Sequence, residues 1–124
     1  MDIDRKQILE SCLEIIAGIS DKEYQKRIWI RGEGPEVDDF DETVCNFFQD
    51  GNGIIQNYKD FEITDKQYLL LVKFRDEFDA FRRGPALKYY FPQEFIDTPE
   101  WGKVTEMAKE VLKAFNYKKS HPTK

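Results

Sequence analysis

Residues that catalysis and metal binding commonly use are scarce in this chain of 124 residues. There is one histidine, His121, and there are two cysteines, Cys12 and Cys45. His121 lies near the end of the chain, in a polar tail that cannot hold it rigidly beside other ligands. A histidine-based nucleophilic site or metal cluster is therefore not expected. The chain also lacks GxxxxGK[ST] and GxGxxG, the motifs that cradle phosphate groups.

Long apolar runs are lacking too. Leu69–Val72 is an uninterrupted run of four residues, whereas a membrane-spanning helix needs about 20. The first residues mix acids with bases and no apolar segment follows them, so no secretory signal is predicted. Cys12 and Cys45 lie among apolar neighbours, which predicts two buried thiols in a reducing compartment and leaves a disulfide between them open. We expect a soluble, cytoplasmic protein.

Apolar residues are abundant enough to build one core. Hydrophobic residues make up 40% of the chain and aromatic residues 15%, and the length is that of one domain. Apolar side chains recur at steps of three and four, the pattern of amphipathic helices, and no convincing strand alternation occurs. The sequence therefore predicts an all-α, compact single-domain bundle of about six helices over residues 1–116, followed by a polar C-terminal tail over residues 117–124.

Capping residues, glycines and prolines predict where these helices begin and end. The prolines and the cluster Tyr89-Tyr90-Phe91 predict an irregular segment over 85–98 that packs through its rings. Those rings, with Trp29 and Trp101, could instead be exposed binding anchors. The first three predicted helices run over about 4–18, from a Ser20–Glu23 capping box to before Gly32, and from an Asp38 or Asp39 cap to the turn at 50–53. The last three run over 54–61, from Thr64 to Arg83, and from Thr98 to Phe115.

The segment Asp50-Gly51-Asn52-Gly53 resembles the middle of a calcium-binding EF-hand loop. In that register the first ligand would be Phe48 and the twelfth would be Lys59, and neither side chain can bind calcium. A glycine-rich turn between two helices is a sufficient explanation. We therefore expect no metal and no cofactor.

The charge of the chain, −5 in total, is unevenly distributed. Residues 1–62 carry 15 acids and 7 bases, whereas residues 63–124 carry 9 acids and 12 bases. Lysine and arginine are absent from Gly32 through Tyr58. Six carboxylates lie close together in this stretch: Glu33, Glu36, Asp38, Asp39, Asp41 and Glu42.

Two interpretations of this acidic segment stay open. One is a solvated turn followed by a first helical turn whose acids complement the helix dipole. The other is a negative surface that binds a basic patch on a partner protein, because charge complementarity speeds encounter. Such a surface argues against direct binding of nucleic acid, which needs a basic face. An enzyme would need paired carboxylates in a deep pocket, for instance Glu33 or Asp38 near Asp41.

The segment from Ile28 to Glu42, with Asn57-Tyr58-Lys59 and Trp101–Phe115, resembles short acidic helical immunity proteins of bacterial contact-dependent inhibition and other polymorphic toxin systems. The resemblance covers most of residues 5–115. It implies a cytoplasmic protein that binds a cognate toxin domain, often a nuclease, and blocks it.

We therefore predict a non-catalytic protein that binds a basic toxin domain, with no membrane and no direct nucleic-acid partner. The predicted partner-binding residues are Glu33, Glu36, Asp38, Asp39, Asp41 and Glu42. The alternative is a regulatory or scaffolding adaptor that binds a partner helix or peptide in an apolar groove. The oligomeric state is left open.

Overall fold

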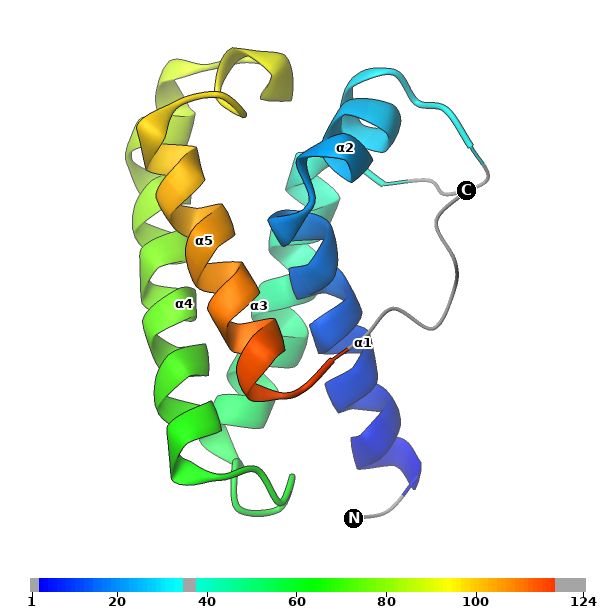
Figure 1. Cartoon of the computed structure of the whole chain (residues 1–124), viewed down its shortest axis with the longest axis vertical. Coiled ribbons are helices and arrows are strands. Elements are labelled where there is room, and N and C mark those ends of the chain that lie inside the picture. Colours follow the sequence, from blue (N-terminus) through cyan, green and yellow to red (C-terminus); the bar gives the residue numbers. More distant parts are fainter. Residues whose placement is uncertain (1–2, 35–37, 118–124) are drawn as a thin grey trace.

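Amphipathic segments form four long helices in the computed structural model, which describes residues 3–34 and 38–117 (Figure 1). No strand occurs within these two ranges, so the all-α prediction is confirmed. None of the helices described there combines the length and the apolar character needed to cross a bilayer. The long helices are α1 (Ile3–Ser20), α3 (Phe40–Gln56), α4 (Asp65–Arg83) and α5 (Pro99–Ala114); the short elements are α2 (Lys22–Tyr24), the π-helical turn η1 (Gln25–Ile30) and the 3-10 turns η2 (Pro85–Lys88) and η3 (Pro92–Glu94).

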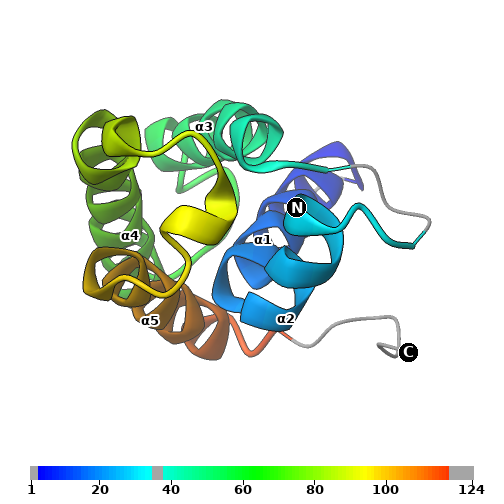
Figure 2. The same ribbon diagram turned by 90° about the horizontal axis from the view of Figure 1, so that it is seen from above.

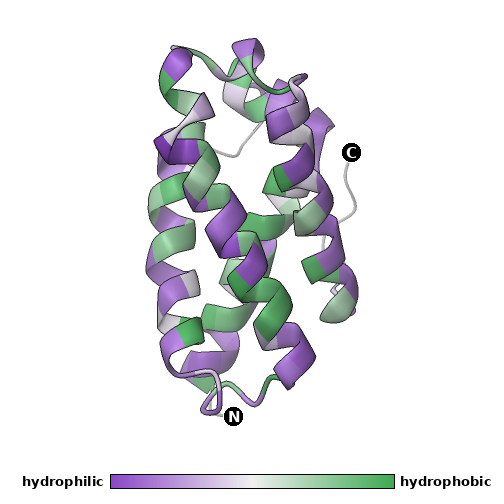
Figure 3. Ribbon diagram, turned by 90° about the vertical axis from the view of Figure 1, so that its left-hand side faces the viewer, coloured by the Kyte–Doolittle hydropathy of each residue, from purple (hydrophilic) through white to green (hydrophobic). Residues whose placement is uncertain are grey.

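The long helices surround one core. Going round the bundle, α1 packs on α3, α3 on α4, α4 on α5, and α5 on α1 (Figure 2). Apolar and polar residues alternate around each helix (Figure 3), as the spacing of three and four requires. Trp101, Phe47, Phe74 and Phe78 are among the largest fully buried side chains. Burial of each such side chain contributes about 1.5–3 kcal/mol, so this core supplies most of the driving force for folding.

Local capping rules predicted three helix starts correctly. Asp39 accepts a hydrogen bond from Glu42 N at 2.8 Å at the start of α3. Thr64 caps α4 in a capping box with Gln67, and Thr98 caps α5, with Pro99 at the first helical position. Each cap satisfies a backbone N–H that the helix itself leaves unpaired and is worth about 1 kcal/mol.

The second predicted helix stops before Gly32 as expected, but it begins one residue later and only its first part, α2, is α-helical. Asp21, not Ser20, is the cap: it accepts from Tyr24 N at 3.1 Å, while the Ser20 hydroxyl donates to Ala17 O at 2.7 Å within α1. After α2 the backbone widens into the π-helical turn η1. That turn ends at Ile30, and Gly32 follows with a φ of 65°, a left-handed conformation that glycine adopts without strain.

The prediction that a helix ends at the glycines of 50–53 is wrong, because α3 continues through them to Gln56. Of the predicted fourth helix over 54–61, residues 54–56 form the end of α3 and residues 57–61 form turns. Gly51 is buried and faces Phe47, where an added Cβ would lie 3.1 Å from the ring. A close approach inside a helix, and not a turn, accounts for this glycine.

Burial was also predicted wrongly at a few positions. Cys12 is buried as expected, but Cys45 is exposed, and both are free thiols. Tyr89 is half-buried, whereas Tyr90 and Phe91 face solvent, because the chain turns there and inserts Phe95 and Ile96 into the core instead. Tyr117 is half-buried against the core, and residues 118–124 of the predicted tail, His121 included, lie outside the described residues.

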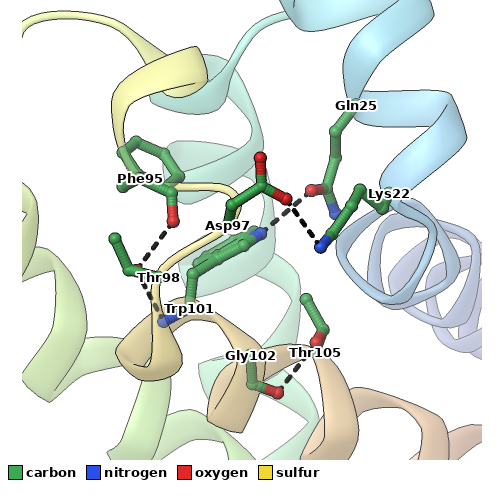
Figure 4. Close-up of polar contacts among 8 residues, drawn as sticks. All are labelled: Lys22, Gln25, Phe95, Asp97, Thr98, Trp101, Gly102 and Thr105. Carbon is green, nitrogen blue, oxygen red and sulfur yellow. Dashed lines mark hydrogen bonds and ion pairs between the residues drawn. The ribbon is translucent and has the colours of Figure 1, made fainter.

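A buried polar cluster fastens the end of α1 to α5 (Figure 4). The amide of Gln25 is fully buried. Its Nε2 donates to Gly18 O at 3.0 Å and to Ile19 O at 2.8 Å, and its Oε1 accepts from Trp101 Nε1 at 2.9 Å. One side chain thus satisfies two carbonyls at the end of α1 and the indole of α5. Buried polar groups are costly unless they are paired in this way.

Candidate protein-binding surface

The helices α1 and α3 form a pair with a strongly acidic surface. The Ser11 hydroxyl of α1 donates to Asp50 Oδ2 of α3 at 3.2 Å, which ties the two helices together. The sequence has no lysine or arginine over residues 7–21 or over residues 32–58. Beyond Arg5 and Lys6 at its start, α1 therefore has no base, and α3 has none at all, so the carboxylates of these stretches have no base on their own helix close by.

A cleft of about 300 Å³ lies between these helices. Glu14 contributes a carboxylate from α1, and Glu42 contributes one from α3. Tyr24 lies close against Gly18, where an added Cβ would be 3.2 Å from the ring. The residues that line the cleft are Ser11, Glu14, Ile15, Gly18, Tyr24, Asp38, Glu42, Thr43 and Asn46.

Asp38 holds one wall of the cleft in place. Its carboxylate accepts from the Tyr24 hydroxyl at 2.9 Å, from Trp29 Nε1 at 3.0 Å, and from the Thr43 hydroxyl at 3.0 Å. These donors come from α2, η1 and α3. Hydrogen bonds to an ionised acceptor are among the stronger ones in proteins, so Asp38 ties the acidic segment to three elements.

The six carboxylates predicted from the sequence have different surroundings in the structure. Glu33 pairs with Arg31, with Nε and Oε1 2.8 Å apart. Asp38 has the three donors described above, and Asp39 caps α3. Glu36 lies outside the described residues.

Asp41 and Glu42 are the two predicted carboxylates that face solvent without a side-chain partner within residues 3–34 and 38–117. Glu42 lines the cleft, and Asp41 is next to it in the first turn of α3. Of the six, this pair is therefore the best placed to meet a basic group from outside.

Sequence reasoning missed the contribution of α1. Glu14 lines the same cleft as Glu42, and Glu10 lies one turn earlier on α1. Burial, and then the charges of Glu14 and Glu10, raise the pKa of the Tyr117 hydroxyl. The signal was the absence of lysine and arginine over residues 7–21, the same signal that marked the acidic segment.

The Cys12 thiol is buried inside the bundle and does not line the cleft. Burial, and to a lesser degree the charge of Asp50, raises the pKa of the Cys12 thiol to about 12, so it stays protonated and unreactive near neutral pH. Among the residues that the structure describes, no group of three or more His, Cys, Asp and Glu side chains could hold a metal ion. Of the carboxylates considered as a catalytic pair, Glu33 or Asp38 near Asp41, Asp38 lines the cleft, whereas Glu33 and Asp41 do not.

Comparison of the chain with protein-family models, with curated proteins and with solved structures found no match. Function is therefore inferred from the geometry and charge of this surface.

Proposed function

We propose that this chain is a non-catalytic binding protein that uses an acidic face to bind a basic protein. The acidic face consists of Glu10 and Glu14 on α1 with Asp41 and Glu42 on α3. The resemblance to bacterial immunity proteins gives this role a specific form. In that form, the chain binds a cognate toxin domain in the cytoplasm and covers its basic, nucleic-acid-binding groove.

One observation carries the proposal: Glu14 and Glu42 line the same cleft from two different helices, and neither has an ion pair or side-chain hydrogen bond within the described ranges. Like charges held close together repel one another, so the arrangement costs the isolated chain some stability. A lysine or arginine from a partner would relieve this repulsion. It would also gain charge-assisted hydrogen bonds in a partly enclosed space.

The neutral groups of the cleft suit the same kind of ligand. The hydroxyls of Ser11 and Thr43 and the amide of Asn46 add oxygen acceptors beside the two carboxylates. A guanidinium group has five N–H donors in a planar fork and no acceptor. An arginine side chain is therefore the group that this cleft would hold best.

The test compares wild type with Glu14→Lys/Glu42→Lys. Each protein is used to capture partners from the host lysate at low salt and at about 0.5 M salt, and the captured domain is then purified for kinetic measurement. We expect wild type to capture a basic domain whose binding is weakened by salt. The association rate of this domain should be at least about tenfold lower for the variant than for wild type. The domain's own activity should be blocked at a one-to-one ratio.

Glu106→Lys/Glu110→Lys is the matched control, because it makes the same change of charge on the exposed side of α5. It should bind nearly as well as wild type. Equal binding by both double variants would contradict the role of the cleft. A bound domain whose activity is unaffected would contradict inhibition.

An adaptor is the second candidate, and exposed apolar side chains at one end of the bundle favour it. Leu87, Tyr90 and Phe91 all face solvent. These side chains lie on an exposed segment. They line neither the cleft between α1 and α3 nor the hollow between α1, α2 and α5. They would therefore act as anchors, not as a groove that receives a helix or peptide.

A further inference from the structure

Three large apolar side chains are exposed within five residues of one another at one end of the bundle. Leu87 is 77% exposed, Tyr90 is 94% exposed and Phe91 is 60% exposed. Leu87 lies in η2, and Tyr90 and Phe91 lie in the segment that connects η2 to η3. An exposed cluster of this kind is a common sign of an interaction surface, whereas scattered single residues are not.

The segment is held in one conformation. Glu94 Oε2 accepts from Tyr90 N at 2.9 Å and from Phe91 N at 2.8 Å, so one carboxylate fixes both amides. Pro92 follows directly, and Phe95 and Ile96 anchor the next turn in the core. A surface that is already ordered loses less conformational entropy when it binds.

Charges of both signs flank these apolar side chains. Arg83 and Lys88 are exposed on one side, at the end of α4 and in η2. Asp39 and Asp41 are exposed at the start of α3. That start lies at the same end of the molecule, because the Phe40 ring packs against Phe95 with centroids 4.9 Å apart (Figures 1 and 2).

We propose that this end of the bundle is a self-association surface, occupied by a second copy of the chain. A two-fold axis through the segment 87–91 would pack the apolar side chains of the copies together. It would also place Lys88 of each copy opposite Asp39 and Asp41 of the other, with Arg83, which pairs with Asp79 of its own helix at 3.0 Å, beside them. A self-complementary patch is what a two-fold interface requires, whereas a partner of one charge sign would be repelled by half of this surface.

The exposed area sets the expected strength of the dimer. Aromatic side chains bury about 150–250 Å² each, so two copies of this patch would bury roughly 800 Å² of apolar surface. Stable interfaces usually bury about 1,200–2,000 Å² in total. The dimer is therefore weak and forms as the concentration rises.

Sedimentation equilibrium of the full chain from about 10 µM to about 1 mM tests this inference, since weak interfaces assemble in that range. The average mass should rise from the 14.7 kDa of one chain towards twice that value. Tyr90→Ser/Phe91→Ser should raise the dissociation constant at least about tenfold. Its unfolding midpoint should not change, because both side chains face solvent.

Leu69→Ser is the matched control, because Leu69 is 56% exposed near the start of α4, at the other end of the bundle. It should associate like wild type, and so should Glu14→Lys/Glu42→Lys, which separates this inference from the proposed function. A monomer at about 1 mM would overturn the proposal. So would association that survives the loss of Tyr90 and Phe91.

A charge exchange tests the two-fold arrangement. Lys88→Glu and Asp41→Lys should each weaken association several-fold, because each places like charges opposite one another. The double variant should recover most of the loss, because the pair is restored with its signs exchanged. Single effects that merely add in the double variant would overturn the two-fold pairing.

Discussion

The helix pair α4–α5 and the helix pair α1–α3 differ in whether their acidic side chains have basic side chains close by. On α4 and α5 the acids have bases close by: Arg82 pairs with Asp79 at 2.8 Å, and Lys109 pairs with Glu106 at 3.0 Å. Over residues 7–21 and 32–58 there is no base at all. Exposed ion pairs contribute only about 0–1 kcal/mol each. The difference therefore concerns recognition more than stability: the pair α4–α5 is balanced within the chain, and the pair α1–α3 leaves negative charge to its surroundings.

Removing the link between the two pairs should have the largest effect. Gln25 joins the end of α1 to Trp101 of α5 through three buried hydrogen bonds. Gln25→Met keeps the approximate shape but leaves the Ile19 carbonyl and the Trp101 indole N–H without this partner, while the Gly18 carbonyl keeps only the hydrogen bond from Asp21 N. We expect a loss of about 3 kcal/mol in the free energy of unfolding, measured in urea.

Lys22→Met is the control for this change, because its ammonium makes an exposed contact with Asp97 at 2.9 Å (Figure 4). It should change the unfolding free energy by less than about 1 kcal/mol. Similar losses in the two variants would mean that the buried amide does not hold the pairs together.

The second prediction separates the carboxylates of the acidic segment by role. Asp38→Ala removes the acceptor of Tyr24, Trp29 and Thr43 and should cost about 2 kcal/mol. Trp29 fluorescence should change, because its indole loses its partner. Asp41→Ala should leave both stability and fluorescence nearly unchanged, since Asp41 has no side-chain partner among the described residues. Equal losses in the free energy of unfolding for the two variants would show that Asp38 and Asp41 contribute equally to folding.

Alkaline pH should weaken the contacts of α1. The pKa of the Cys12 thiol is raised from 9.0 to about 12, and burial with Glu14 and Glu10 raises the pKa of Tyr117. Because folding raises these pKa values, the folded chain holds protons that the unfolded chain releases. Full stability is present below pH 9, and the contribution of Cys12 is lost as pH rises from 9 to about 12.

Urea unfolding between about pH 8 and 10.5 measures this slope, which should reach roughly 1 kcal/mol per pH unit. Cys12→Ala should begin less stable and decline less steeply. Cys45→Ala, at an exposed thiol, should decline like wild type. Parallel declines in all three proteins would assign the pH dependence to other groups.

The smallest effect should come from placing a base in the acidic pair. Glu14→Lys puts a cation opposite Glu42 in the cleft and should raise stability by about 0.5 kcal/mol. Glu110→Lys, on the balanced helix α5, should change little. The gain should disappear in about 1 M salt, which screens exposed charges. A loss of stability of Glu14→Lys at low salt would contradict the view that the carboxylates of Glu14 and Glu42 repel each other.

Several features of the fold could be predicted from short stretches of sequence. Asp39, Thr64 and Thr98 were placed as caps because capping depends on residues within one turn. The helix end at 50–53 was wrong for the same reason. Each glycine costs a helix about 1 kcal/mol, and the burial of Phe47, Ile54 and Ile55 on one side of α3 outweighs that cost.

The candidate site was predictable only in part. Asp41 and Glu42 could be named because they lie in an acid-rich segment. Glu14 could not, since it belongs to a helix about 28 residues earlier, and only the packing of α1 on α3 brings it to the cleft. For Tyr90 and Phe91 the sequence left both packing and exposure open, because whether a ring is buried depends on where the chain returns to the core.

By itself, the sequence determined that the chain is helical, where several helices begin, and that two long stretches have no base. The tertiary structure alone decided which carboxylates are engaged by the protein and which remain free to meet a partner. The physical reason is the sequence distance over which each kind of interaction acts. Caps and amphipathic stripes act over one or two turns, whereas burial and the pairing of charges depend on side chains that are distant in sequence and meet only in the folded bundle.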